Sequence, residues 1–174
     1  MDLKLKRTPG IYLVGFMASG KTTVAQMLAD ELGWHFADID HDIESAKQMK
    51  IPEIFESLGE QVFRTMETEA IQRRIRSVER GRPTVVALGG GAFIADANYR
   101  LLTEHGVTIW IDCPFDVICQ RVGQNSHRPL AQDREKMTKL YDDRRDAYAR
   151  ADYRIHCSGD SRAAVQEILS LPIF

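Results

Sequence analysis

Residues 11–22 read Ile-Tyr-Leu-Val-Gly-Phe-Met-Ala-Ser-Gly-Lys-Thr, a short apolar run followed by a glycine loop. The segment from Gly15 to Thr22 fits the pattern G-x-x-x-x-G-K-[ST], and the residues after it have helical spacing. A loop of this kind between a strand and a helix directs backbone N–H groups and the positive end of the helix at phosphate oxygens. The stretch therefore predicts an α/β fold that binds a nucleoside triphosphate.

The last residues of this loop have separate predicted roles. Lys21 brings a positive charge to the β- and γ-phosphates, and the hydroxyl of Thr22 is a hard oxygen ligand suited to Mg²⁺. The other residues expected to contact ATP in and beside the loop are Ala18, Ser19, Gly20 and Thr23.

Apolar strand-like runs alternate with helical periodicities along the rest of the chain. Strands are expected at 11–14, 35–39, 84–88, 107–111 and 153–156, and helices at 23–32, 52–58, 60–80, 96–105, 114–122, 134–150 and 160–171. This alternation implies right-handed crossovers and a parallel sheet covered on both faces, a three-layer sandwich. A chain of 174 residues suits one such domain, spanning 1–174.

Composition excludes several functional classes. The formal net charge is −2, with acidic and basic residues interspersed, which argues against a nucleic-acid surface. Residues 1–10 are polar and lack the apolar run of a signal peptide, and no stretch approaches the roughly twenty apolar residues of a membrane span. The three cysteines have no metal-like spacing and are expected to be free thiols. We expect a cytoplasmic monomer that binds neither nucleic acid nor membrane.

An acidic pair, Asp38 and Asp40, ends the second expected strand. With a strand period of two, both side chains would point the same way, beyond the carboxyl edge of the sheet where ligands bind. One carboxylate would hold a metal-bound water and the other would accept a hydrogen bond from an acceptor hydroxyl, which suits phosphoryl transfer. Two alternatives stay open: a helix N-cap formed by Asp40 and Asp42, and a metal-binding carboxylate at Asp112.

Two arginines need an anionic partner. Arg144 shares the apolar face of its expected helix with Leu140 and Tyr148, and an unpaired charge on such a face is strongly unfavourable. The partner would be either a structural carboxylate or a substrate carboxylate. Arg64 lies one turn from Glu67, so a solvated ion pair is an equally simple explanation for it.

Glycines and a polar loop complete the candidate site. Gly89, Gly90 and Gly91 follow the expected strand at 84–88 and leave room for a ligand against bare backbone, although a tight turn is the simpler alternative. The polar loop at about 123–133 has the character of a lid, with Arg128 stabilising charge on the transferred phosphoryl group. Arg121 precedes this loop and would stack on a base; an ordinary exposed arginine is the alternative.

In this order the pieces resemble the shikimate kinase family of P-loop proteins, over residues 11 to about 171. The residues that carry the resemblance are Gly-Phe-Met-Ala-Ser-Gly-Lys-Thr-Thr (15–23), Asp-Ile-Asp (38–40), Gly-Glu-Gln-Val-Phe-Arg (59–64) with Glu67, Gly-Gly-Gly (89–91), Arg-Pro-Leu (128–130) and Arg-x-x-x-Tyr (144–148). One departure is Ala18, where the family loop often has glycine. Its methyl group would cost about 1 kcal/mol if the backbone there is left-handed.

The resemblance implies a fold, an activity and roles for single residues. The fold would be five parallel strands ordered 2-3-1-4-5, with a shikimate-binding segment at about 40–70. The activity would be transfer of the γ-phosphoryl group of ATP to the 3-hydroxyl of shikimate. The implied roles are shikimate contacts at Asp40, Arg64, Gly90 and Arg144, Mg²⁺ ligation at Thr22 and Asp38, phosphate contacts at Lys21 and Arg128, and an adenine contact at Arg121.

Two rival functions remain at this level. One is a P-loop kinase for another small acceptor, such as gluconate or a nucleotide. The other is a nucleotide-binding homologue without activity. The two arginines favour an acceptor with a carboxylate, and none of the expected catalytic groups, Asp40, Lys21 and Arg128, is missing.

Overall fold

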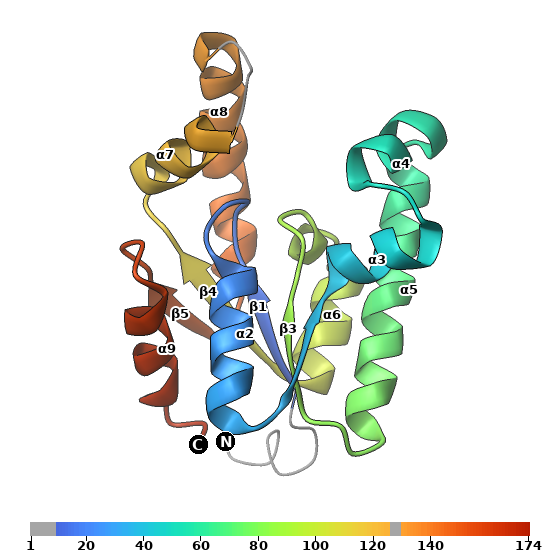
Figure 1. The fold of residues 1–174 in the computed structure, drawn as a ribbon, viewed down its shortest axis with the longest axis vertical. Coiled ribbons are helices and arrows are strands. Elements are labelled where there is room, and N and C mark those ends of the chain that lie inside the picture. The colour runs from blue at the N-terminus through green and yellow to red at the C-terminus, as the bar shows by residue number, and fades with distance from the viewer. Residues whose placement is uncertain (1–9, 126–129) are drawn as a thin grey trace.

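The strands of the computed structural model, which describes residues 10–125 and 130–174, form one sheet (Figure 1). They are β1 (Gly10–Val14), β2 (His35–Asp38), β3 (Thr84–Ala87), β4 (Val107–Asp112) and β5 (Tyr153–His156). All neighbouring strands are parallel, and their order is β2-β3-β1-β4-β5. The predicted α/β fold and its strand order are confirmed.

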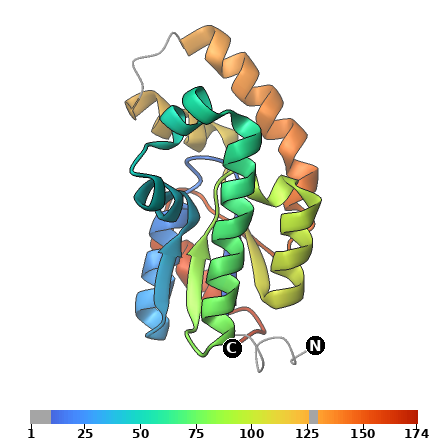
Figure 2. The same cartoon turned by 90° about the vertical axis from the view of Figure 1, so that its right-hand side faces the viewer.

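Helices cover both faces of this sheet (Figure 2). On one face lie α2 (Lys21–Leu32) and α9 (Ser161–Leu169), and on the other lie α5 (Glu60–Glu79), α6 (Asp96–His105) and α8 (Leu130–Tyr148). The central strand β1 serves both cores, because Ile11 and Leu13 belong to one apolar cluster while Tyr12 and Val14 belong to the other. The sheet is therefore the middle of three layers.

Two groups of helices rise beyond the carboxyl edge of the strands (Figure 1). One group is α3 (Ile39–Lys47), α4 (Ile51–Leu58) and the first turns of α5, and the other is α7 (Phe115–Asn125) with the first turns of α8. The loop that follows β1 lies between them. Among the described helices, none is both long and apolar enough to cross a membrane.

Helix α3 corrects the sequence-based prediction, which extended the second strand to 39 and placed the next helix at 52–58. The chain turns at Asp38, whose side chain accepts a hydrogen bond from the backbone N–H of His41 at 3.1 Å and so caps the new helix. Asp40 therefore lies in the first turn of a helix and does not continue the strand alternation, and neither Asp40 nor Asp42 is the N-cap.

Three further boundaries differ from expectation. A short 3₁₀ helix, η1 (Ala92–Ile94), was not predicted, and Asp96 is the first residue of α6, after an N-cap at Ala95. The polar segment predicted as a loop at 123–133 is partly helical, because α7 continues to Asn125 and α8 begins at Leu130. Polar residues on exposed helical turns give no apolar periodicity for a sequence pattern to detect.

Candidate phosphate and acceptor site

The glycine loop joins β1 to α2 and depends on close backbone packing. Gly15 has φ 147°, and a Cβ atom added to it would lie 2.7 Å from the carbonyl oxygen of Ile111 in β4. Gly20, with φ 92°, is the N-cap of α2. Ser19 is buried inside the loop, whereas Thr22 and Thr23 are exposed on the first turn of the helix. The loop thus presents the helix N-terminus outward, as phosphate binding requires.

Lys21 is buried and holds the loop together. Its Nζ donates hydrogen bonds to the carbonyl oxygens of Gly15 at 2.8 Å and Phe16 at 2.7 Å, and to Ser19 Oγ at 3.4 Å. Burial lowers the pKa of Lys21 to about 8, although the carboxylate of Asp40 opposes this shift. Lys21 therefore carries its positive charge at neutral pH but loses it more readily than an exposed lysine.

Ala18 is the irregular position of the loop. Its φ is 58°, in the left-handed region that disfavours any residue with a Cβ atom. The methyl group of Ala18 therefore has the energetic cost that the sequence analysis predicted for a left-handed backbone.

We expect Ala18→Gly to raise the free energy of unfolding by about 1 kcal/mol or less. Removing the methyl group relieves the left-handed penalty of roughly 1–2 kcal/mol, and the larger entropy of glycine in the unfolded chain cancels part of that gain. Urea unfolding of both proteins measures the difference. Ala25→Gly, in the middle of α2, should be destabilising in the same experiment. A destabilised Ala18→Gly variant would contradict the strain argument.

A hydroxyl and a carboxylate meet beside the loop. Thr22 Oγ1 donates a hydrogen bond of 2.7 Å to Oδ2 of Asp38, which is also the N-cap of α3. Both groups are hard oxygen ligands of the kind that Mg²⁺ accepts, and Mg²⁺ in nucleotide sites usually takes only one or two protein ligands. The described residues contain no group of three or more His, Cys, Asp or Glu side chains that could hold a metal ion.

Two carboxylates converge on Gly89, which follows β3. A Cβ atom added to Gly89 would lie 2.8 Å from Asp40 Oδ1 and 3.2 Å from Glu67 Oε2. Both oxygens are buried and have no hydrogen-bond partner within residues 10–125 and 130–174. Burial raises the pKa of Asp40, with a further contribution from Asp38, and burial also raises the pKa of Glu67. Buried polar atoms nearly always have partners, so these oxygens indicate a place for a polar ligand.

Two arginines face the next two glycines. A Cβ atom at Gly90 would lie 3.3 Å from Arg144 Nη1, and one at Gly91 would lie 2.7 Å from Arg64 Nη1. Arg64 donates to the buried Glu67 at 2.8 Å, while Arg144 forms no ion pair among the described residues. The glycines are needed for close approach, and the second guanidinium keeps its charge for a ligand.

Arg121, on α7, lies at the other end of the loop. Its guanidinium donates to the carbonyl oxygens of Ala18 at 2.8 Å and Gly159 at 3.2 Å, and so connects the glycine loop to the segment after β5. Its predicted contact with a base stays a prediction. Arg128, the predicted phosphate contact of the lid, lies outside the described residues.

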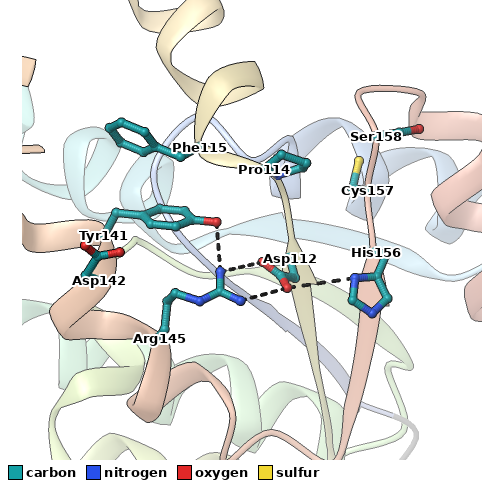
Figure 3. Close-up of a pocket in the computed structure, with 9 residues that line it drawn as sticks. All are labelled: Asp112, Pro114, Phe115, Tyr141, Asp142, Arg145, His156, Cys157 and Ser158. Atoms are coloured by element: carbon teal, nitrogen blue, oxygen red, sulfur yellow. Dashed lines mark hydrogen bonds and ion pairs between the residues drawn. The ribbon is translucent and has the colours of Figure 1, made fainter. Parts of the chain in front are cut away.

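Asp112 forms ion pairs with two arginines. Its carboxylate accepts hydrogen bonds from Arg145 at 2.9 and 3.2 Å and from Arg154, and Arg145 also stacks over Trp110 at 5.0 Å. Asp112 and Arg145 border a cavity of about 450 Å³, lined also by Tyr141 (Figure 3). Asp112 therefore anchors α8 to β4.

Tyr148 was predicted only as an apolar neighbour of Arg144. It is buried, and its hydroxyl donates to the carbonyl oxygen of Gly90, which holds the glycine run against α8. Tyr148 lies four residues after Arg144, which places both on one helix face. This spacing is the sequence pattern that could have predicted a site role for Tyr148.

Known proteins are similar to this chain over most of its length. The model of the shikimate kinase family matches residues 17–171. The chain belongs to the shikimate kinase family. The shikimate kinase of Persephonella marina is 41% identical over 161 residues, which cover 91% of this chain and 96% of that protein. That of Ruegeria pomeroyi is 42% identical over 154 residues, covering 87% and 77%.

A solved structure of the shikimate kinase family has the same fold. The shikimate kinase from Acinetobacter baumannii, in complex with shikimate, is 34% identical and superposes with a TM-score of 0.84. The match covers 97% of this chain and 95% of that one. The family resemblance seen in the sequence is confirmed.

Proposed function

We propose that this member of the shikimate kinase family transfers the γ-phosphoryl group of ATP to the 3-hydroxyl of shikimate, giving shikimate 3-phosphate and ADP. The observation that carries the proposal is the group around Gly89–Gly91, where Asp40, Arg64 and Arg144 converge next to the glycine loop. A P-loop supplies the donor site, and an acid with two guanidinium groups suits an acceptor that has both hydroxyls and a carboxylate.

Asp40 is the group that acts on the acceptor hydroxyl. Its buried and unpaired Oδ1 accepts the hydroxyl proton, or holds the hydroxyl by a hydrogen bond, as the oxygen attacks the γ-phosphorus. Burial and the neighbouring Asp38 raise the pKa of Asp40, which makes it a stronger base than an ordinary aspartate. Asp40 thus combines the position and the basicity that the reaction needs.

Charge on the phosphoryl group is balanced from the loop side. Lys21 stabilises the negative charge of the β- and γ-phosphates, and we assign Arg128 the same task from the lid. Thr22 and Asp38 would hold Mg²⁺, which when bound neutralises charge on the phosphate oxygens. In phosphoryl transfer such positioning and charge stabilisation make up most of the catalysis.

The acceptor carboxylate binds to the two arginines. Glu67 already neutralises Arg64 in part, whereas Arg144 has no carboxylate partner within the described residues. A carboxylate placed beside Gly90 would complete this charge balance, which favours an acceptor that carries a carboxylate. Arg121 would lie along the adenine.

The predicted division of the chain stands as part of this proposal. Residues 1–174 form a single P-loop kinase domain, with the shikimate-binding segment at about 40–70 and a lid at about 123–133. That the protein is a cytoplasmic monomer stays a prediction.

A coupled assay that follows ADP release tests the function directly. Shikimate should support turnover, while gluconate and nucleoside monophosphates at the same concentration should not. ATP binding without shikimate-dependent turnover would instead indicate an inactive homologue.

Neighbouring arginines on α8 should have different effects when each is replaced by alanine. Arg144→Ala should raise the KM for shikimate by about 10- to 100-fold, since a charge-assisted contact contributes roughly 1.5–3 kcal/mol. Arg145→Ala should mainly lower Tm, because Arg145 pairs with Asp112 at 2.9 Å, away from Gly90. Steady-state kinetics and thermal unfolding of both variants check this split. If Arg144→Ala were unfolded, Arg144 would have a structural ion pair and not the proposed contact with the substrate.

The kcat/KM for ATP should fall as the pH rises above about 8, the value to which burial lowers the pKa of Lys21. This ratio reports the free enzyme, in which Lys21 loses its proton and its charge above that pH. Bound phosphates favour the charged form, so kcat itself should fall only at higher pH. A pH profile of both constants measures the difference. Superimposable profiles would remove Lys21 as the titrating group.

A further inference from the structure

Two cysteines occupy neighbouring positions at the ends of adjacent strands. Cys113 directly follows β4 and Cys157 directly follows β5, after the register pair Asp112 and His156. The backbone N–H of Cys157 donates to the carbonyl oxygen of Asp112 at 2.9 Å, so the ladder continues to the cysteines. Neighbouring parallel strands are about 4.8 Å apart, within the Cα separation of roughly 4.4–6.8 Å found across disulfides.

The two thiols have different chemical environments. Both are free and buried. A hydrogen bond from the Cys113 thiol lowers the pKa of Cys157, with further contributions from the backbone of Gly159 and the charge of Arg121, while the same thiol hydrogen bond and burial raise the pKa of Cys113. The thiolate is the reactive form of cysteine, so Cys157 is the nucleophile of the pair.

A small molecule has a route to this pair. Cys157 lines the cavity of about 450 Å³ near Asp112, and Figure 3 shows its side chain between Pro114 and Ser158. A hydroperoxide is much smaller than this cavity. Cys119, the third free cysteine, does not line it.

We propose that Cys113 and Cys157 form an oxidation site that closes to an intrachain disulfide when it reacts with a hydroperoxide. The Cys157 thiolate attacks the terminal peroxide oxygen, the O–O bond breaks, and the alkoxide or hydroxide leaves with a proton as alcohol or water. Cys113 then loses its proton and attacks the sulfenic sulfur, and water leaves as the S–S bond forms. In total two thiols lose two electrons and two protons, and the hydroperoxide is reduced to alcohol and water, or to two waters.

The disulfide would act on the nucleotide site. Cys157 lies two residues before Gly159, whose carbonyl oxygen holds Arg121 against the loop carbonyl of Ala18. The disulfide would fix the backbone of Cys157 close to this contact, and we expect it to reorient the Gly159 carbonyl, loosen Arg121 and so weaken nucleotide binding. This second step rests on the proposed function, because it takes the glycine loop to be the ATP site.

Peptide mapping after treatment with hydrogen peroxide tests the site without any activity measurement. The expected product is a Cys113–Cys157 disulfide that dithiothreitol reduces. Cys119→Ser is the matched control and should give the same disulfide, whereas Cys113→Ser should leave Cys157 as a sulfenic acid that dimedone traps. Thermal unfolding of each variant establishes that it is folded. Absence of the Cys113–Cys157 disulfide in the folded wild-type protein would overturn the site.

Calorimetry with ADP, in the absence of shikimate, tests the coupling to the nucleotide. The oxidised protein should bind ADP about fivefold or more weakly than the reduced protein, a typical size for coupled sites. Equal affinity in the two forms would overturn the coupling, and absence of ADP binding in both would instead contradict the proposed function.

Discussion

Asp40→Asn should lower kcat by about 10²- to 10⁴-fold, the range expected when a positioned general base is lost. Asparagine has the same shape and still accepts a hydrogen bond, but it does not take a proton from the acceptor hydroxyl. Oδ1 of Asp40 is buried beside Gly89 without a hydrogen-bond partner among the described residues, where we propose that the acceptor binds. Steady-state measurement of kcat for both proteins at saturating ATP and shikimate gives the size of this decrease. A loss below about tenfold would show that Asp40 only orients the hydroxyl.

The pH profile and the stability of this variant sharpen the test. Because burial raises the pKa of Asp40, the wild-type acid limb should lie at higher pH than for an ordinary aspartate, and it should disappear in Asp40→Asn. For the same reason the ionised carboxylate destabilises the folded state above its raised pKa, so Asp40→Asn should have an equal or higher Tm at neutral pH. Asp30→Asn, on an exposed position of α2, is the control and should change neither property.

Arg128→Ala should lower kcat by about 10³-fold or more, by analogy with arginines that stabilise the transferred phosphoryl group. Arg128 follows α7, and this helix already contacts the glycine loop through Arg121 and Ala18. The KM for shikimate and the Tm should stay near their wild-type values, since the assigned contact is with the phosphates. Arg134→Ala, on an exposed position of α8, provides the control in the same assay. A kcat within tenfold of wild type would exclude Arg128 from the mechanism.

Local pattern predicted most of the elements but not the point where the chain leaves the sheet. The strand at 35–38 was predicted, but α3 was not. Ile39 and Ile43 are four residues apart, a spacing that fits the period of a strand as well as that of a helix. In the structure a local interaction and tertiary packing both favour the helix. Asp38 caps it, and Ile39 and Ile43 are buried. As a consequence Asp40 reaches the site from a helix, although the sequence had placed it on a strand.

Two adjacent arginines on α8 show that the sequence pattern also does not predict the partners of charged groups. The pattern placed Arg144 on the apolar face of the helix and Arg145 away from it, whereas in the structure Arg145 also faces inward, stacking over Trp110 and donating to the hydroxyl of Tyr141. It did not show that Arg145 would pair with Asp112, because the partner of a charge depends on which elements pack together. The sequence had left Asp112 open as a metal ligand, and in the structure its carboxylate pairs with Arg145 and Arg154.

The sequence by itself determined the phosphate loop, the alternation of strands and helices, and the family, because these are written in local spacing and in ordered motifs. Only the tertiary structure decided that Ala18 is left-handed, with φ 58°. It also decided that Asp40 and Glu67, from different helices, converge on Gly89. The physical reason is that periodicity specifies which face of an element is buried, whereas contacts between charged groups arise from how the crossover helices pack on the sheet.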